Sequence, residues 1–353
     1  MTPLAGITVA EALSAGCPLA LRLSAGIAGR IAADLGARVI KLEPAEGDPV
    51  RRLPPFATGG RSALFAFLNA GKQSIRDDPA TAARLIERAD AALVDDGRDE
   101  RAPTSVVLSM LAPDLPGAAT AGPQSEFTLM ALGGLLDIVG DPARQPLRLG
   151  GHQLAYSAGL AAYAGLVAGL LRRPAAETAR VALLDVAVWI NWKSAASVAA
   201  MNELSTRAGR AAEWPVLRCA DGYYALVHQP ADWPALCKLS GDPRLAEPRF
   251  ADPTARRANS LALADILEQS LGRLTRGELQ ERAKEMRLPL GAVWDMAELR
   301  RDPQVLAREF LAEARMGTGA PLALPRLPLL WNGTAFPVGA VPEAVAASVE
   351  TAS

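Results

Sequence analysis

The fold is decided by two short apolar stretches, Gly6-Ile-Thr-Val-Ala10 and Arg38-Val-Ile-Lys-Leu-Glu43. Between them, leucines and isoleucines recur every four residues from Pro18 to Leu35, which places them on one face of a helix. Gly36 follows that pattern, as glycine commonly does at a helix C-terminus. A strand, a helix and a second strand in this order form a βαβ unit with a right-handed crossover, so the two strands are parallel.

Strands and helices continue to alternate beyond this unit. We predict strands at residues 91–94, 104–111 and 181–186, and helices at residues 79–88, about 126–139 and 154–171. Such alternation is typical of a mostly parallel sheet covered by helices. The fold class predicted from the pattern is therefore α/β.

A second region begins near residue 207. Residues 214–219 and 223–228 flank Ala220-Asp-Gly222, and Asp-Gly between two apolar runs is a strong hairpin signal. Helices are predicted around residues 233–239, 261–271 and 276–286. The Pro-rich stretch at residues 320–338 is expected to lie across another domain rather than to fold alone.

The charge balance excludes one class of partner. The 353 residues hold 37 Lys and Arg against 38 Asp and Glu, for a net charge of -1. Binding to nucleic acid needs a clustered surplus of cations, so no nucleic-acid partner is expected. Two histidines, His152 and His228, cannot build a His-rich metal site, and we expect no metal.

The cysteines and the apolar runs indicate the compartment. Cys17, Cys219 and Cys237 are far apart and odd in number, which favours a reducing environment over a disulfide framework. No signal-peptide pattern is present, so we expect a cytoplasmic protein. The run Leu154–Leu171 is long enough to span a membrane, but its Ala, Gly, Ser and Tyr content favours a buried helix.

No self-contained catalytic motif identifies a reaction. The small-residue stretch Ser24-Ala-Gly-Ile-Ala-Gly29 predicts close helix–sheet packing. A structural or solvated role is favoured for His152 and, more strongly, for His228. Lys72 follows the turn Asn69-Ala-Gly71, so we expect it to be exposed and either solvated or in contact with a phosphate. These residues alone indicate an enzyme-sized α/β protein.

The order of several segments along the chain is more informative than any one of them. The segments are residues 3–9, 33–44 and 47–51, Leu68-Asn-Ala-Gly-Lys-Gln-Ser-Ile75, Pro146-Leu-Arg-Leu-Gly150, Ala158-Gly159, residues 214–223 and Asp302-Pro-Gln304. In this order, over nearly the whole chain, they resemble the family III CoA-transferases, the CaiB/BaiF family. Each motif alone is weak, and their common order carries the resemblance.

The resemblance implies a domain plan. Residues 1–190 are expected to form a Rossmann-like, CoA-binding large domain, and residues 191–210 a linker. Residues 211–318 would form a smaller α/β domain, and residues 319–353 would return to the large domain. Two chains would interlock as rings, either two copies of this chain or this chain and a relative.

The resemblance also implies a reaction, the transfer of coenzyme A from an acyl-CoA to a carboxylate. In the family an Asp attacks the thioester, in a segment of the type G-x-P-x-x-D-x-x-x-G. The matching segment here is Gly150–Gly159, and the Asp position falls on Ala155. The α-methylacyl-CoA racemases of the family are a weaker match, because their His falls on Ser125 and their Asp again on Ala155.

One acidic residue remains near the implied active site. Glu126 matches a position that is commonly acidic in the family, and it begins a predicted helix, where a carboxylate also favours the helix dipole. A helix-start role is at least as well founded as catalysis. For contacts to CoA the resemblance implies Arg30, Arg51, Lys72, Ile75, Arg76, Asp77 and Asp96.

Two departures bear on these CoA contacts. The stretch from Gln73 to Pro79 is one residue short of the family pattern. The link from Asp95 to Thr104 lacks the longer loop and helix that usually follow that strand. Trimmed loops here predict weaker or altered CoA binding.

Three hypotheses follow. The first, which we favour, is a CoA-transferase subunit that lacks its own nucleophile and pairs with a paralogue that carries the Asp. The second is a homodimeric CoA-transferase with displaced chemistry, through Glu126 or a direct ternary route. The third is a non-catalytic acyl-CoA-binding protein. The acyl donor and the acceptor are not identified by the sequence.

Overall fold

The chain divides into two units, each of which we describe by itself. The computed structural model describes residues 2–113, 122–201, 207–212, 214–317 and 319–343. Unit 1 consists of Met1–Leu136, Arg148–Glu203 and Gln304–Ser353, and unit 2 of Asp137–Leu147 and Leu204–Pro303.

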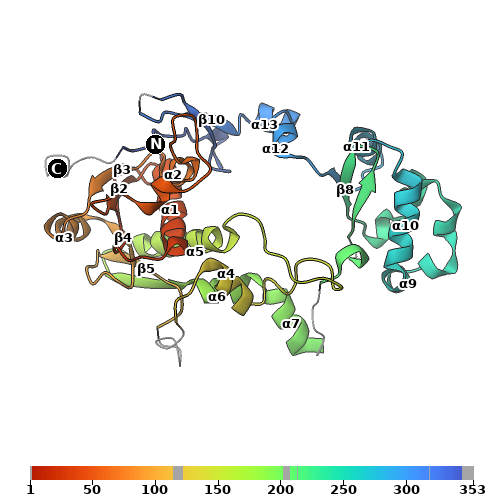
Figure 1. Cartoon of the computed structure of the whole chain (residues 1–353), viewed down its shortest axis with the longest axis horizontal. Helices are drawn as coiled ribbons and strands as arrows, with labels where there is room; N and C mark the ends of the chain where they lie inside the picture. Colours follow the sequence, from red (N-terminus) through yellow and green to blue (C-terminus); the bar gives the residue numbers. More distant parts are fainter. Residues whose placement is uncertain (1, 114–121, 202–206, 213, 318, 344–353) are drawn as a thin grey trace. The chain divides into compact units, whose positions relative to one another are not determined.

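A six-stranded sheet forms the centre of unit 1 (Figure 1). Its order is β3-β2-β1-β4-β5-β6, and every neighbouring pair is parallel. The strands are β1 Thr8–Ala12, β2 Arg38–Glu43, β3 Gln73–Arg76, β4 Ala91–Asp95, β5 Thr104–Ser109 and β6 Glu177–Ala182. Val9 in β1 lies opposite Val39 in β2 and Ala91 in β4. The predicted α/β class and βαβ unit are therefore confirmed.

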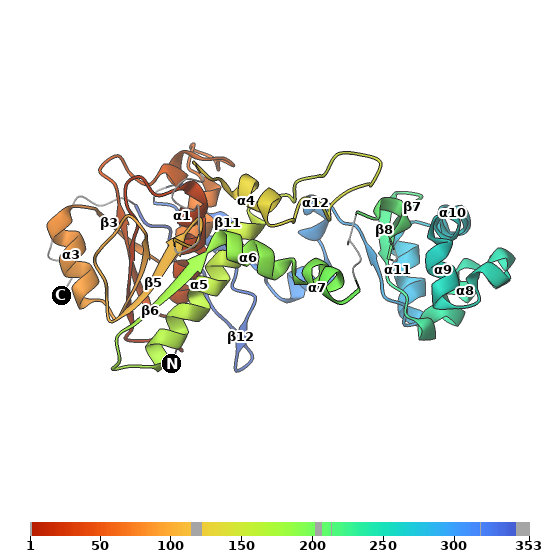
Figure 2. The same ribbon diagram turned by 90° about the horizontal axis from the view of Figure 1, so that it is seen from below.

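Helices cover both faces of this sheet. The helices of unit 1 that precede its last segment are α1 Leu19–Asp34, α2 Ala63–Asn69, α3 Pro79–Arg88, α4 Glu126–Leu132, α5 Gln153–Leu171, α6 Leu183–Ile190 and α7 Trp192–Met201, of which α7 buries no residue. Figure 2 shows α1 and α5 side by side on one face and α3 on the other. A Cβ at Gly159 of α5 would lie 2.7 Å from the Ser24 carbonyl oxygen of α1, so this close helix contact requires glycine.

Helix α5 is the helix whose apolar sequence raises the question of a membrane span. In the part of the chain that the structure describes, it is the one helix long and apolar enough to cross a membrane. Its buried residues include Leu154, Ala158, Ala162 and Leu166, which recur every four residues and pack in the unit 1 core. This is the burial pattern of a core helix.

Two predicted boundaries are wrong. The strand predicted at residues 181–186 lies earlier, as β6 Glu177–Ala182, and Leu183 begins helix α6. A short run of apolar residues fits either a strand or a buried helix, so its periodicity does not place the boundary. Helix α4 ends at Leu132 rather than near residue 139, because Gly133 caps it and Gly134 adopts a positive φ of 74°.

Unit 2 has a core of its own, built on a three-stranded antiparallel sheet. The strands are β7 Val216–Cys219, β8 Gly222–Leu226 and β9 Leu290–Ala292, in the order β7-β8-β9. The helices are α8 Trp233–Ser240, α9 Pro253–Ala258, α10 Ser260–Leu271, α11 Arg276–Glu285 and α12 Met296–Leu299. The predicted Asp-Gly hairpin is confirmed as β7–β8.

The last segment belongs to unit 1. It contains α13 Pro303–Ala307, β10 Leu311–Ala314, β11 Leu322–Pro325, β12 Leu330–Trp331 and β13 Thr334–Ala335. Met316, Leu324 and Val341 share a buried cluster with Phe65 and Leu68 of α2. The Gly71 N–H donates to the Ala340 carbonyl at 2.8 Å, which ties this segment to the turn after α2.

Both units also contain short 3-10 helices. They are η1 Pro49–Arg52 in unit 1, and η3 Gly209–Ala211, η4 Pro230–Asp232, η5 Pro243–Ala246 and η6 Pro248–Phe250 in unit 2.

Candidate functional site

The candidate site lies where α4 and α5 begin. Ser125 caps α4 with a reciprocal box: its hydroxyl accepts from the Thr128 N–H, and its own N–H donates to the Thr128 hydroxyl. This cap fixes Glu126 as the first helical residue. Helix α5 precedes β6 and runs antiparallel to the strands, so its N-terminus lies at the carboxyl edge of the sheet, where α/β proteins bind ligands.

The Glu126 carboxylate is buried and bonded through both oxygens. Oε1 accepts the Ala155 N–H at 3.1 Å, and Oε2 lies 2.7 Å from Nδ1 of His152. The carboxylate therefore reaches the backbone of the residue at which the family resemblance places an Asp. Ala155 itself is fully buried, in a cluster with Leu23 and Ile27.

The pairing with Glu126 sets the tautomer of His152. An ionised carboxylate only accepts hydrogen bonds, so in the neutral form of the ring the proton lies on Nδ1, and Nε2 carries the lone pair. The His152 side chain is 27% exposed, against 8% for Glu126. Among the described residues, Nε2 has no hydrogen-bond partner.

One aromatic side chain, that of Tyr156, lies against this pair. The ring of Tyr156 lies edge-on, 6.1 Å from that of His152 and 6.1 Å from that of Phe67. Burial and the nearby charge of Glu126 raise the pKa of the Tyr156 hydroxyl, which therefore stays protonated. On the first turn of α4, Phe127 is half-exposed and lies beneath the Arg148 guanidinium.

Lys72 is not exposed, contrary to the expectation from its turn. Its ammonium is completely buried and lies 2.6 Å from Oε2 of Glu11, with the Gly26 carbonyl and Oδ1 of Asn69 at 2.9 and 3.0 Å. The buried carboxylate of Glu11, in the first strand, draws the lysine inward. A Cβ at Gly29 would lie 2.6 Å from the same Glu11 oxygen, so the small-residue stretch of α1 leaves room for these charges.

A second lysine completes the buried network. Lys41 Nζ lies 2.7 Å from Oε1 of Glu11 and 2.7 Å from Oδ2 of Asp48. Burial alone would raise the pKa of Glu11, but Lys41 and Lys72 hold it below its ordinary value. Burial lowers the pKa of Lys72 to about 8 in spite of Glu11, whereas Glu11 and Asp48 raise that of Lys41.

Two other residues predicted to contact CoA, Arg30 and Arg51, form hydrogen bonds with groups of the protein. Arg30 is buried; its Nε donates to Asp34 at 2.8 Å and another nitrogen to the Phe67 carbonyl at 2.6 Å. Arg51 makes a bidentate pair with Glu43 at 2.6 and 2.7 Å, and its guanidinium lies 3.7 Å from the centre of the Phe65 ring.

The remaining predicted contacts lie at the carboxyl ends of β3 and β4. Ile75 is half-buried in β3, Arg76 is exposed at its end, and Asp77 follows it and pairs with Arg98. Asp96 follows β4 and pairs with Arg180 at 2.8 Å. The Asp77–Arg98 pair joins the loops after these two strands. The sequence does not predict a role for Arg98 at this edge, and the only feature that points to it is its position shortly after β4.

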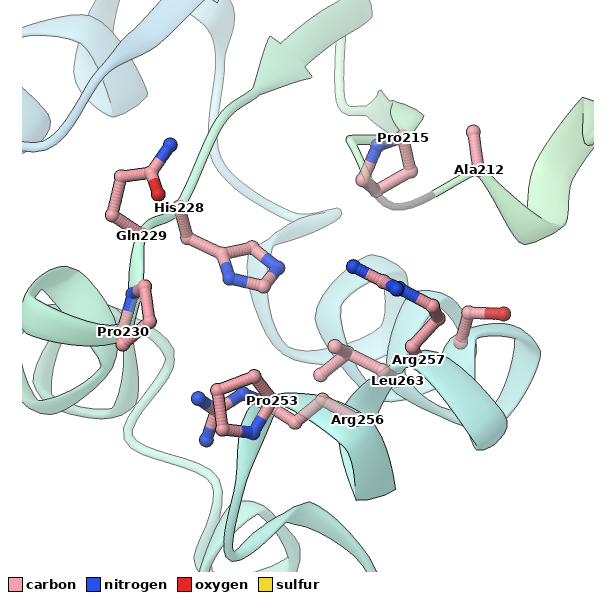
Figure 3. Close-up of a pocket in the computed structure, with 10 residues that line it drawn as sticks. Ala212, Pro215, His228, Gln229, Pro230, Pro253, Arg256, Arg257 and Leu263 are labelled. Atoms are coloured by element: carbon pink, nitrogen blue, oxygen red, sulfur yellow. The ribbon is translucent and has the colours of Figure 1, made fainter. Parts of the chain in front are cut away.

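Unit 2 contains a separate cavity of about 230 Å³ (Figure 3). The imidazole of His228 and the guanidinium of Arg257 point into it from opposite sides. Its third basic side chain, Arg256, is buried, stacks over Trp233 at 4.3 Å and donates to the Phe250 carbonyl at 2.9 Å. Arg256 is thus part of the packing of unit 2, and none of the predicted site residues lies here.

No metal site is evident in the described ranges, since they hold no group of three or more His, Cys, Asp or Glu side chains arranged to bind an ion.

The parallel sheet and the second α/β unit are those of a protein of the CaiB/BaiF type. A crystal structure of a CaiB/BaiF family protein from Brucella suis superimposes with a TM-score of 0.82 and 26% identity, covering 97% of this chain and 96% of that one. The model of CoA-transferase family III matches residues 4–344, and the chain belongs to this family. The resemblance identified from the sequence is confirmed.

Two curated relatives carry the names of particular reactions. Acetyl-CoA:oxalate CoA-transferase of Acetobacter aceti is 27% identical, over 80% of this chain and 80% of its own length. Succinate–glutarate CoA-transferase of Agrobacterium fabrum is 27% identical, over 94% of this chain and 90% of its own length.

Proposed function

We propose that this protein transfers coenzyme A from an acyl-CoA to a carboxylic acid, with Glu126 as the attacking carboxylate. The observation that supports this most directly is the 3.1 Å bond from the Ala155 N–H to Oε1 of Glu126. It puts a carboxylate beside the backbone of the residue at which the resemblance expects an Asp, and this supports Glu126 as its substitute. The names of the relatives, with oxalate and glutarate among them, support a carboxylate acceptor.

The chemistry needs a carboxylate and no proton transfer. A Glu126 oxygen attacks the thioester carbon, the C–S bond breaks, and a mixed anhydride and a CoA thiolate result. The thiolate attacks the glutamyl carbonyl, which releases the donor acid and leaves an enzyme thioester. The acceptor carboxylate attacks that thioester to form a second anhydride, and the returning thiolate attacks its acyl carbon, giving the new acyl-CoA and free Glu126.

The CoA moiety has a place at the same edge of the sheet. We propose that it lies along the loops after β3 and β4, against Ile75, Arg76, Asp77 and Asp96, with Arg51 nearby. Lys72 and Arg30 are buried, so in this proposal they support the edge from below rather than touch phosphate. The expected division into large domain, linker, small domain and returning segment, and the cytoplasmic location, belong to the same proposal.

A second candidate is a heteromer in which a paralogue supplies the Asp. The buried methyl group of Ala155 favours it, because that side chain cannot attack a thioester. Large apolar side chains on α6 and α7 support an oligomer of either kind: Trp189 is 76% and Trp192 66% exposed. In this candidate the site is complete only in the mixed oligomer.

One experiment separates these candidates. The purified chain is incubated with acetyl-CoA and oxalate or glutarate, and the protein is analysed by intact mass with and without hydroxylamine. A hydroxylamine-sensitive adduct on the wild-type chain, absent from Glu126→Gln, is the expected result. A chain that is inert alone and active with an Asp-bearing paralogue supports the heteromer. CoA binding without turnover in either case supports a non-catalytic binding protein, and absence of CoA binding contradicts all three.

A further inference from the structure

The pair formed by Glu126 and His152 has the geometry of a general base rather than of a nucleophile alone. Glu126 is anchored by the Ala155 N–H and its side chain is 8% exposed, whereas the side chain of His152 is 27% exposed. We propose that the protein also hydrolyses acyl-CoA thioesters when no acceptor is bound, with His152 activating water. This inference rests on the proposed function only in placing the acyl-CoA at the start of α5.

The charge arrangement supports proton abstraction by His152. Glu126 holds the ring proton on Nδ1, at 2.7 Å, so the Nε2 lone pair is available to take a proton from water. Once protonated, the imidazolium is stabilised by the carboxylate that it already contacts. Because the carboxylate is bonded through both oxygens, the ring keeps one orientation during this transfer.

The loop that precedes His152 leaves space at Gly150. Gly150 and Gly151 precede His152, and no atom lies within 4 Å of the position that a Cβ on Gly150 would take. The ring of Tyr156 lies edge-on to that of His152, and Phe67 lies against Tyr156. Among the described residues, no hydrogen bond at Nε2 has to be broken before a water molecule can bind there.

The step balances without any further reactant. His152 Nε2 takes a proton from water as the water oxygen attacks the thioester carbon. The tetrahedral intermediate collapses, the C–S bond breaks, and the imidazolium returns its proton to the CoA thiolate. One acyl-CoA and one water give one carboxylic acid and one CoA thiol, and Glu126 stays ionised throughout.

The test measures thiol release from acetyl-CoA and from succinyl-CoA with no acceptor present. We expect release above the buffer rate, and a fall of roughly 100-fold or more in His152→Gln, which is the usual contribution of a general base. The other histidine of the chain provides the matched control, because His228→Gln changes unit 2 and should hydrolyse at the wild-type rate. Thermal melting and calorimetric CoA binding show that each variant is folded and binds.

Comparison with transfer separates this inference from the proposed function. Transfer needs no proton, so the ratio of hydrolysis to transfer should fall about ten-fold or more in His152→Gln. Wild-type release at the buffer rate from both thioesters, in a protein that binds CoA, overturns the inference and leaves transfer standing. An equal loss of both activities also overturns it, because His152 would then only position Glu126. Hydrolysis without any transfer or adduct contradicts the proposed function alone.

Discussion

Two carboxylates of unit 1 are both buried next to basic side chains, but their partners differ in access to solvent. Glu11 lies completely buried between Lys41 and Lys72, and every polar atom of the three finds a protein partner. Glu126 is also buried, but its partner His152 keeps a nitrogen without a bond in the described part of the chain. This difference suits a stabilising role for the first group and, under the proposed function, a chemical role for the second, whose His152 side chain is 27% exposed.

The largest effect is expected at Glu126. Glu126→Gln removes the attacking oxygen but keeps the size of the side chain, and CoA transfer should fall about 10³-fold or more. The measurement is the rate of acyl exchange by the pure chain, with the melting temperature as a control for folding. If Glu126→Gln transfers CoA at a rate near that of the wild type, Glu126 is not the nucleophile. The two carboxylates would then not differ in function.

Substitution at Glu11 should act on stability instead. Glu11→Gln leaves two buried ammonium groups without their shared counter-charge, and breaking a buried pair typically costs about 3–5 kcal/mol. Urea denaturation measures the change in the free energy of unfolding. A loss below about 1 kcal/mol, or transfer activity that falls while stability holds, would contradict the structural role of this network.

Lys72 gives the network a pH dependence. Its pKa is about 8 in the folded protein and near 10.5 when unfolded, so between these values the unfolded chain binds more protons. The free energy of unfolding of the wild type, relative to Lys72→Met, should therefore rise with pH across this range, by roughly 3 kcal/mol in total. Urea titrations from pH 7.5 to 10.5 measure this slope. If the free energy of unfolding of the wild type, relative to Lys72→Met, falls with rising pH, the pKa of Lys72 is raised rather than lowered.

The smallest effect is expected from Gly29→Ala. The added methyl group approaches Glu11 Oε2 to 2.6 Å and forces the buried charges apart, at a cost of about 1–3 kcal/mol. Gly277→Ala is the matched control, because a Cβ there meets no atom within 4 Å and α11 favours alanine over glycine. Equal melting temperatures for the two variants would contradict this prediction, because they would show that α1 accommodates a methyl group beside Glu11.

Local patterns predicted the framework well. The βαβ unit, α3 and the β7–β8 hairpin follow from periodicity and turn residues within a few positions of one another. The boundary between β6 and α6 does not follow from these signals, because the apolar run at residues 181–186 fits either a strand or a helix. The end of α4 was also missed, although Gly133 and Gly134 were visible in the sequence.

The site was less predictable, because its contacts join distant residues. Glu126 was singled out by its position in the family, but its bonds to His152 and Ala155 span 26 and 29 residues. Lys72 was misjudged for the same reason, since its partner Glu11 lies 61 residues earlier in the chain. Spacing along the chain carries no information about such pairs.

The return of the last segment to unit 1 has a consequence for synthesis on the ribosome. Phe65 and Leu68 emerge early, whereas Met316, Leu324 and Val341, which cover them, are made almost at the end. Until then an apolar surface near the turn at Gly71 stays open to water and to other nascent chains. A message truncated between residues 204 and 303 would therefore yield an incomplete product prone to aggregation, even though all six strands of the main sheet had already been translated.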